Sequence, residues 1–289
     1  MADIKSIAVL GAGQMGGGIA QVAAVSGLRV SVFDSFPGAT EKCAAVHKKS
    51  LAKFVEKGKL SQADMDAALG RISFVGSLDA LPADTDWVVE AVVEDAKVKA
   101  ELFAKLAAKF TRPEVVLATN TSSISITQIA ASAGAAASRV VGMHFFNPVP
   151  LMQLVEVIPA VQTSPDVVER TIALATKLGK TPLKANDRAG FISNRVLMPM
   201  INEAFYAWME GVAEPEAIDG IMKLGCNFPM GPLRLADFIG LDTCVHIMNV
   251  LADGLNNDRY RACPALKQLV MAGRLGDKTG RGVFEYPKK

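Results

Sequence analysis

The sequence predicts an α/β fold: a doubly wound parallel sheet with a helical-hairpin insertion, followed by a separate all-α domain. Three observations lead to this prediction. Short apolar runs alternate with helical patterns through the first part of the chain, which is typical of a parallel sheet with both faces covered. The first run, Ser6 to Leu10, enters a glycine-rich turn directly. From Phe191 onward every pattern is helical, so we expect domains at 1–185 and 186–289 that meet at a polar hinge, 186–190.

The composition indicates a globular protein with no global signal for nucleic acid or membrane. The chain has 289 residues, 50% of them hydrophobic, and 31 basic against 29 acidic side chains. The four cysteines and three histidines show no ligand spacing, which predicts reduced thiols and no metal site. No apolar run reaches the roughly 18 residues of a membrane span. We expect a cytoplasmic protein, although a mitochondrial matrix protein whose leader had been removed would look the same.

The glycine-rich turn predicts a dinucleotide site. Gly11 would make the tight turn, Gly13 would let the backbone approach a pyrophosphate, and Gly16 would let helix pack closely on strand. The next strand, Arg29 to Phe33, ends at Asp34, whose carboxylate is placed to bind ribose hydroxyls and to repel a 2′-phosphate. A glycine triplet alone also fits any tight strand-to-helix turn. Together with the strand, the helix and the acid it predicts a Rossmann-type domain that prefers NAD to NADP. The turn comprises Gly11, Ala12, Gly13, Gln14, Met15 and Gly16.

An insertion at about 37–70 reads as a basic helical hairpin. Its first helix carries Ser50, Lys57 and further lysines, and Ser61 is placed to cap its second helix. The simpler interpretation is a solvated amphipathic face. The alternative is a cradle for a multiply phosphorylated part of a substrate.

Later strands deliver polar side chains to one edge of the sheet. We expect strands at 72–75, 87–93 and 115–118 and a helix at about 95–110. Ligands bind outside the carboxyl ends of such strands. One of Ser122 and Ser123 is expected to cap the next helix, which begins near Ser125. The polar residues on or near this edge are Glu90, Glu94, Lys99, Asn120, Ser122 and His144.

The stretch from Val141 to Val157 carries a histidine and a glutamate on two successive apolar strands. His144 ends the first strand, and Glu156 lies on the second, after a turn at 147–150. If this turn reverses the chain, imidazole and carboxylate lie side by side, as a base and its orienting group do. A histidine beside an apolar run is more often a core residue, and a surface loop between buried strands is the alternative.

The helix expected from about Ile192 to Glu210 is apolar on nearly all faces. Such a helix needs burial on several sides, which suggests a domain core that continues into a dimer interface. Asn194 and Arg195 are polar exceptions near its start. An Asn in a first turn is commonly structural, so both a site role and a scaffold role stay open.

Seven motifs carry a family resemblance. They are GAGQMG at 11–16, VVEAVVED at 88–95, TNTSS at 119–123, HFFNPVPLMQLVEV at 144–157, AGFISNRVL at 189–197, GPLRLADFIGLD at 231–242 and DKTGRGVFEY at 277–286. With them the chain resembles the L-3-hydroxyacyl-CoA dehydrogenase family over essentially its whole length, and within it the short-chain enzymes that act on 3-hydroxybutyryl-CoA.

The resemblance implies a homodimer, formed through a helical substrate and dimerisation domain, that oxidises (S)-3-hydroxyacyl-CoA with NAD and reduces acetoacetyl-CoA in reverse. It implies that His144 is the general base, that Glu156 orients it, and that Ser122 and Asn194 complete the catalytic set. The implied cofactor contacts are Gly11, Ala12, Gly13, Gln14, Met15, Gly16, Asp34, Glu94, Lys99, Ser122, Asn147 and Lys278. The implied substrate contacts are Ser50, Lys57, Ser122, Asn147 and Asn194.

Two alternatives stay open. A related dehydrogenase of a free hydroxy acid, as in the gulonate branch, could share the His and the Glu. A non-catalytic relative of the crystallin type could keep the nucleotide-binding fold, although it would have no need of all five polar residues Ser122, His144, Asn147, Glu156 and Asn194. The lysine-dependent β-hydroxyacid dehydrogenases fit worse, since no lysine starts the Ile192 helix.

Overall fold

A computed structural model describes residues 4–287 of the chain. The chain divides into two compact units, Met1–Asp187 and Arg188–Lys289. The division falls within the predicted hinge at 186–190. The first unit holds the sheet, and the described part of the second is helical apart from isolated bridges.

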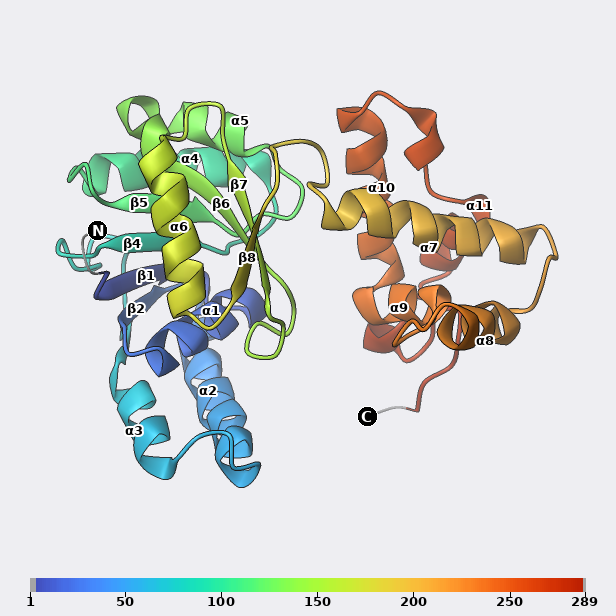
Figure 1. Cartoon of the computed structure of the whole chain (residues 1–289), viewed down its shortest axis with the longest axis horizontal. Helices are drawn as coiled ribbons and strands as arrows, with labels where there is room; N and C mark the ends of the chain where they lie inside the picture. The colour runs from blue at the N-terminus through green and yellow to red at the C-terminus, as the bar shows by residue number, and fades with distance from the viewer. Residues whose placement is uncertain (1–3, 288–289) are drawn as a thin grey trace. The chain divides into compact units, whose positions relative to one another are not determined.

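The first unit is built on one eight-stranded sheet, in the order β3-β2-β1-β4-β5-β6-β7-β8 (Figure 1). Chain order reverses on either side of β1, so the sheet is doubly wound, as predicted. All neighbouring strands are parallel except β6 and β7, which are antiparallel because a short turn connects them. The strands are β1 Ser6–Leu10, β2 Arg29–Phe33, β3 Ile72–Val75, β4 Trp87–Glu90, β5 Val116–Thr119, β6 Val140–Phe145, β7 Leu154–Pro159 and β8 Thr181–Lys184.

Helices cover both faces of this sheet. Side chains of α1 and α6 share one buried cluster with alternate residues of the strands, and α4 and α5 lie on the opposite face (Figure 1). The predicted hairpin is present as α2 and α3, and Ser61 caps α3 by accepting from the Asp64 N–H. The helices are α1 Gln14–Val25, α2 Ala39–Glu56, α3 Gln62–Gly70, α4 Ala96–Lys109, α5 Ile126–Ser132, the 3₁₀ helix η1 Gly134–Arg139 and α6 Pro165–Lys177.

The prediction of a strand at 87–93 is wrong at its C-terminal end, because β4 stops at Glu90. The Glu90 carboxylate accepts a hydrogen bond from the Val92 N–H, which turns the chain away from the sheet. The apolar run therefore continues past the strand as a loop that leads to Asp95, the cap of α4.

The second unit packs its helices around a separate apolar cluster to which Met198, Phe205, Leu233 and Met248 contribute. Between residues 4 and 287, no single helix has the length and apolar composition of a membrane span. The helices α9 and α10 pass that test only as a pair, and they are bent by 97°. The elements are α7 Ser193–Met209, α8 Pro215–Gly225, α9 Pro232–Ile239, α10 Leu241–Gly254, η2 Asp258–Tyr260, α11 Pro264–Met271 and η3 Asp277–Thr279.

Candidate active site

The glycine turn between β1 and α1 has the shape of a dinucleotide cradle. Gly11 has φ +102°, and any side chain there would overlap the Ala91 carbonyl. A Cβ at Gly16 would overlap the Gly11 carbonyl, so only glycine lets α1 begin this close to the strand. A Cβ at Gly13 would meet no protein atom within 4 Å. The open side of the turn thus lies at the N-terminus of α1, where N–H groups attract phosphate.

Asp34 lies beside this turn at the carboxyl end of β2. One carboxylate oxygen accepts from the Ala12 N–H at 2.6 Å, and the other accepts from the Phe36 N–H at 2.8 Å. These bonds hold the acid at the turn that would cradle the pyrophosphate, which is the position a ribose-binding carboxylate needs. The residues present therefore fit NAD.

A cavity of about 790 Å³ opens between this turn, the hairpin helix α2 and the loop at 147–151. Ala12, Gly13 and Gln14 line it on one side, and Asn147 lines it on another. Among the described residues around it, the charged side chains are the lysines 42, 53, 57 and 59, with no carboxylate, and Ser50 lies among them. A pocket lined this way attracts a multiply charged anion. Ser50 and Lys57 of the hairpin therefore line a cavity, and their contact with a substrate stays a prediction.

His47 anchors the hairpin to the cofactor turn. Its side chain is buried, and Nε2 donates to the Gly17 carbonyl in the first turn of α1 at 2.7 Å. Burial lowers the pKa of His47, and the hydrogen bond to Gly17 only partly offsets this effect. This role could not be predicted from the sequence, because His47 stands among lysines in an otherwise basic helix.

His144 and Glu156 face each other across β6 and β7. The two residues are paired in the antiparallel register, and His144 Nδ1 lies 2.7 Å from Glu156 Oε2. Both side chains are buried. Because a carboxylate only accepts, Nδ1 is the donor, and Nε2 becomes the nitrogen that can take up a proton. The turn at 147–150 therefore does reverse the chain and pairs the two side chains.

Strand alternation places this pair on the α5 face of the sheet. Gly142 lies two residues before His144 on the same face, and a Cβ there would meet Ile126 of α5 at 2.9 Å. The segment 120–125, which leads into α5, contains Ser122. The His144 side chain and the segment that contains Ser122 therefore lie on the same face of the sheet.

Glu94 organises the serine segment. One of its oxygens accepts from the Thr121 hydroxyl at 2.6 Å, from the Ser122 N–H at 2.9 Å and from the Ser123 hydroxyl at 2.9 Å. Burial alone would raise the pKa of Glu94, but the charge of Lys99 and these donors outweigh it, so the pKa lies below its ordinary 4.5. Glu94 is therefore a carboxylate at neutral pH.

The expectation that Ser122 or Ser123 caps the following helix is wrong. Ser125 is the cap of α5, with its hydroxyl accepting from the Gln128 N–H. Asp187 reinforces this helix end by accepting from the N–H groups of Ile126 and Thr127 at 3.1 and 2.7 Å. Ser122 and Ser123 instead belong to the Glu94 network.

Lys99 lies beneath this network. It is 1% exposed, and its ammonium pairs with Glu90 at 2.5 Å and with Glu94 at 3.3 Å. Glu90 is also fully buried and accepts from the Thr119 hydroxyl at 2.7 Å. The buried Lys99 ammonium thus helps to hold the Glu94 carboxylate in place.

The predicted contacts Asn194 and Lys278 belong to the second unit. Asn194 is buried in the first turn of α7. Lys278 pairs with Asp242 at 2.6 Å. Among residues 4–287 no group of His, Cys, Asp and Glu could hold a metal ion, and all four cysteines are free.

Two family models match the chain. The model of the 3-hydroxyacyl-CoA dehydrogenase NAD binding domain matches residues 6–188, and the model of the C-terminal domain of the same family matches 190–286. The chain belongs to the 3-hydroxyacyl-CoA dehydrogenase family. As a member of this family it is an NAD-dependent oxidoreductase, and the boundary between the two family domains falls within the predicted hinge.

Relatives in this family match the chain over nearly its whole length. A probable 3-hydroxybutyryl-CoA dehydrogenase of Deinococcus radiodurans is 57% identical over 96% of the chain and 99% of its own length. One of Bacillus subtilis is 51% identical over 99% of both chains. The crystal structure of (S)-3-hydroxybutyryl-CoA dehydrogenase from Ralstonia eutropha superposes with a TM-score of 0.93 at 46% identity, covering 99% of this chain and 100% of that one.

The Glu94 network predicts how stability responds to acid. Because the folded-state pKa of Glu94 is lowered, its stabilisation is complete above 4.5 and is lost as pH falls through the folded-state pKa. Glu94→Gln should lower the free energy of unfolding by about 1 to 3 kcal/mol at neutral pH, and the loss should shrink in acid. Denaturant titrations across pH measure this. Glu101→Gln, on the exposed side of α4, is the control, and equal losses at neutral and acidic pH would contradict the prediction.

Proposed function

We propose that this enzyme interconverts (S)-3-hydroxybutyryl-CoA and acetoacetyl-CoA with NAD. The observation that carries the proposal is the buried His144–Glu156 pair, joined through the 147–151 loop to a cavity bounded by the dinucleotide turn and by four lysines. The names of the relatives from Deinococcus and Bacillus support the short acyl chain. The lysines supply the charge that the phosphates of coenzyme A require.

His144 transfers the proton. In the oxidation, Nε2 accepts the proton of the C3 hydroxyl as carbonyl character builds at C3. Meanwhile Nδ1 keeps its own proton and donates it in a hydrogen bond to Glu156. The carboxylate stabilises the imidazolium that results, and in the reduction the same imidazolium returns its proton to the forming alkoxide. When bound, NAD supplies the hydride acceptor of the oxidation. A positioned base of this kind contributes about 10² to 10⁴ in rate.

The other site residues position the reactants. Ser122 and Asn194 are proposed to hydrogen-bond the substrate, and Asn147 to contact cofactor and substrate. The Glu94 network fixes the backbone of the Ser122 segment before substrate arrives, which reduces the entropy lost on binding. Lys99 is buried under that network, so we assign it to holding Glu94 in place. Glu94 and Lys278 are also proposed to contact the cofactor directly.

A substrate panel tests the proposed function. We expect high kcat/KM for acetoacetyl-CoA, lower values for longer 3-oxoacyl-CoA thioesters, and little turnover of free acetoacetate. The free hydroxy-acid alternative predicts the opposite order, with gulonate-type substrates oxidised and the coenzyme A handle irrelevant. A non-catalytic relative would bind NADH and turn over none of them.

Glu156→Gln should retain activity with a changed pH dependence. The amide keeps an acceptor for Nδ1–H but carries no charge, so the imidazolium of His144 is less favoured. As pH rises, the reduction should therefore lose its activity at a lower pH than in the wild type. We expect kcat to fall about tenfold, less than when the base itself is removed. The measurement is kcat for acetoacetyl-CoA reduction across pH. Glu169→Gln, at an exposed position of α6, should leave the profile unmoved, and an unmoved profile in Glu156→Gln would make Glu156 a scaffold residue only.

A cytoplasmic location and a homodimer formed through the helical domain also stay proposals. The exposed apolar side chains of the second unit, including Val196 and Met209 of α7, support the second of these. Light scattering or analytical ultracentrifugation measures the oligomeric state directly.

A further inference from the structure

Lys180 is a buried lysine that binds the loop between the two catalytic strands. It lies immediately before β8 and is 8% exposed. Its ammonium donates to the Val149 carbonyl at 2.5 Å and to the Met152 carbonyl at 2.8 Å. One side chain thus ties together both halves of the loop that follows Asn147.

Two backbone carbonyl oxygens hold the charge of Lys180. In the described part of the chain, no carboxylate pairs with this ammonium, and burial lowers its pKa. A buried cation without a counter-ion is costly. An apolar side chain could fill the same space without this cost. The contribution that requires the charge is therefore the pair of hydrogen bonds to the loop carbonyls.

The same loop is fixed from its other side by α1. Val149 is 2% exposed and packs on Gly18, where a Cβ would lie 2.7 Å from the Val149 Cβ. Residues 147–151 also form one wall of the 790 Å³ cavity. The loop is therefore held between the cofactor-binding helix and Lys180 while its outer surface faces the proposed substrate.

We propose that Lys180 is a positioning residue of the dehydrogenase reaction, which clamps the 147–152 loop and so places Asn147 and the cavity wall for productive binding. The inference rests on the proposed function. His144 and Glu156 are aligned by their own strand ladder, so Lys180 acts on substrate placement and leaves the proton transfer unchanged.

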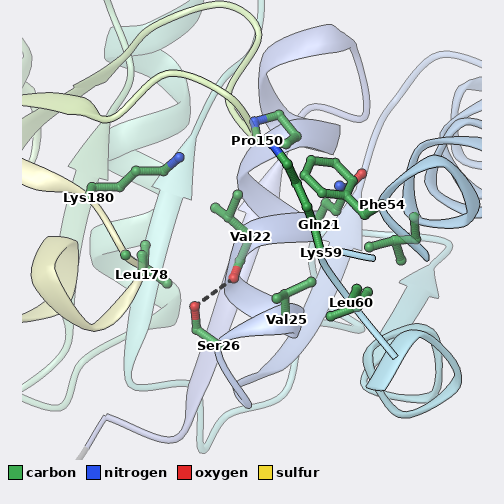
Figure 2. A pocket seen from close by; sticks show the side chains of 12 residues that line it. Gln21, Val22, Val25, Ser26, Phe54, Lys59, Leu60, Pro150, Leu178 and Lys180 are labelled. Atoms are coloured by element: carbon green, nitrogen blue, oxygen red, sulfur yellow. Dashed lines mark hydrogen bonds between the residues drawn. The ribbon is translucent and has the colours of Figure 1, made fainter. Parts of the chain in front are cut away.

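A second cavity, of about 320 Å³, makes this proposal testable by chemical rescue. Figure 2 shows Lys180 and Leu178 on one side of it, with Phe54 and Leu60 on the other. Its walls are mixed, with apolar side chains such as Val22 and Phe54 beside the polar Gln21 and Lys59. If Lys180 is shortened to alanine, the vacated space joins this cavity, and a small alkylammonium ion gains a route to the two carbonyls.

The test compares Lys180→Met with Lys184→Met, an exposed lysine of β8. Lys180→Met keeps the aliphatic stem and removes every donor. We expect kcat/KM for acetoacetyl-CoA to fall about tenfold or more, with the pH profile unchanged, and the Lys184 variant to match the wild type. In Lys180→Ala, n-propylammonium should restore kcat/KM several-fold. Tetramethylammonium carries the charge but has no N–H donor, and it should restore nothing.

Each outcome bears on a different claim. A wild type that fails to reduce acetoacetyl-CoA contradicts the proposed function itself. A wild type that turns over, with Lys180→Met equally active, overturns the positioning role, as does a shifted pH profile or rescue by both ions alike. Should Lys180→Met not fold, Lys180→Ala prepared in n-propylammonium decides the question, because diluting the amine must then lower kcat/KM in the folded protein.

Discussion

Replacing His144 with Gln is expected to lower kcat for acetoacetyl-CoA reduction by about 10² to 10⁴. Glutamine can still donate toward Glu156, so the pairing of β6 with β7 survives, but its amide cannot exchange a proton at neutral pH. The cofactor cradle comes from other strands. NADH should therefore bind with nearly unchanged affinity, which fluorescence titration measures beside the steady-state rate.

The matched control for this substitution is His246→Gln. His246 is exposed on α10 and has no part in the proposed site. It should retain wild-type kcat. Full activity in the His144 variant would remove the proposed base, whereas loss of both activity and NADH binding would mean that the substitution had disturbed the fold.

Replacing Asp34 with Asn is expected to lower the preference for NADH over NADPH about 10²-fold. The carboxylate lies at the glycine turn through its bonds to the N–H groups of Ala12 and Phe36. Like charges that meet at an interface cost several kcal/mol, and roughly 1.4 kcal/mol corresponds to a factor of ten. Removing the charge therefore relieves the repulsion of a 2′-phosphate and weakens the binding of the ribose hydroxyls.

The ratio of kcat/KM for the two cofactors measures this effect. Asp79→Asn makes the same charge change at an exposed position between β3 and β4 and should leave the ratio as it is. An unchanged ratio in Asp34→Asn would show that another group selects the cofactor. A fall in activity with both cofactors alike would point to collapse of the turn, since one backbone N–H loses its acceptor in this variant.

Most of the sheet could be predicted because each strand is short, apolar and followed by a turn or a helix signal. The glycine turn and Asp34 were equally readable, because their spacing follows from the geometry of one βαβ unit. The end of β4 was not. The run from Trp87 to Val93 stays apolar after the strand has ended, and only the bond from Val92 to the Glu90 side chain reveals the end.

The paired side chains of the site were predictable where the sequence placed them on adjacent strands. His144 and Glu156 needed only a turn between two apolar runs, and the structure supplies their register. The groups that hold the surrounding loops and helices were not predictable, because they contact residues far away in the chain. Lys180 reaches Val149, His47 reaches Gly17, and Asp187 reaches the start of α5. No local pattern encodes such contacts.

The most direct test of the central claim is the loss of NADH absorbance when the purified protein is mixed with NADH and acetoacetyl-CoA. The account predicts rapid oxidation of NADH that forms one 3-hydroxybutyryl-CoA of S configuration per NADH. It predicts almost no oxidation when free acetoacetate replaces acetoacetyl-CoA or when NADPH replaces NADH. Tight binding of NADH with no oxidation in the presence of the thioester would contradict it.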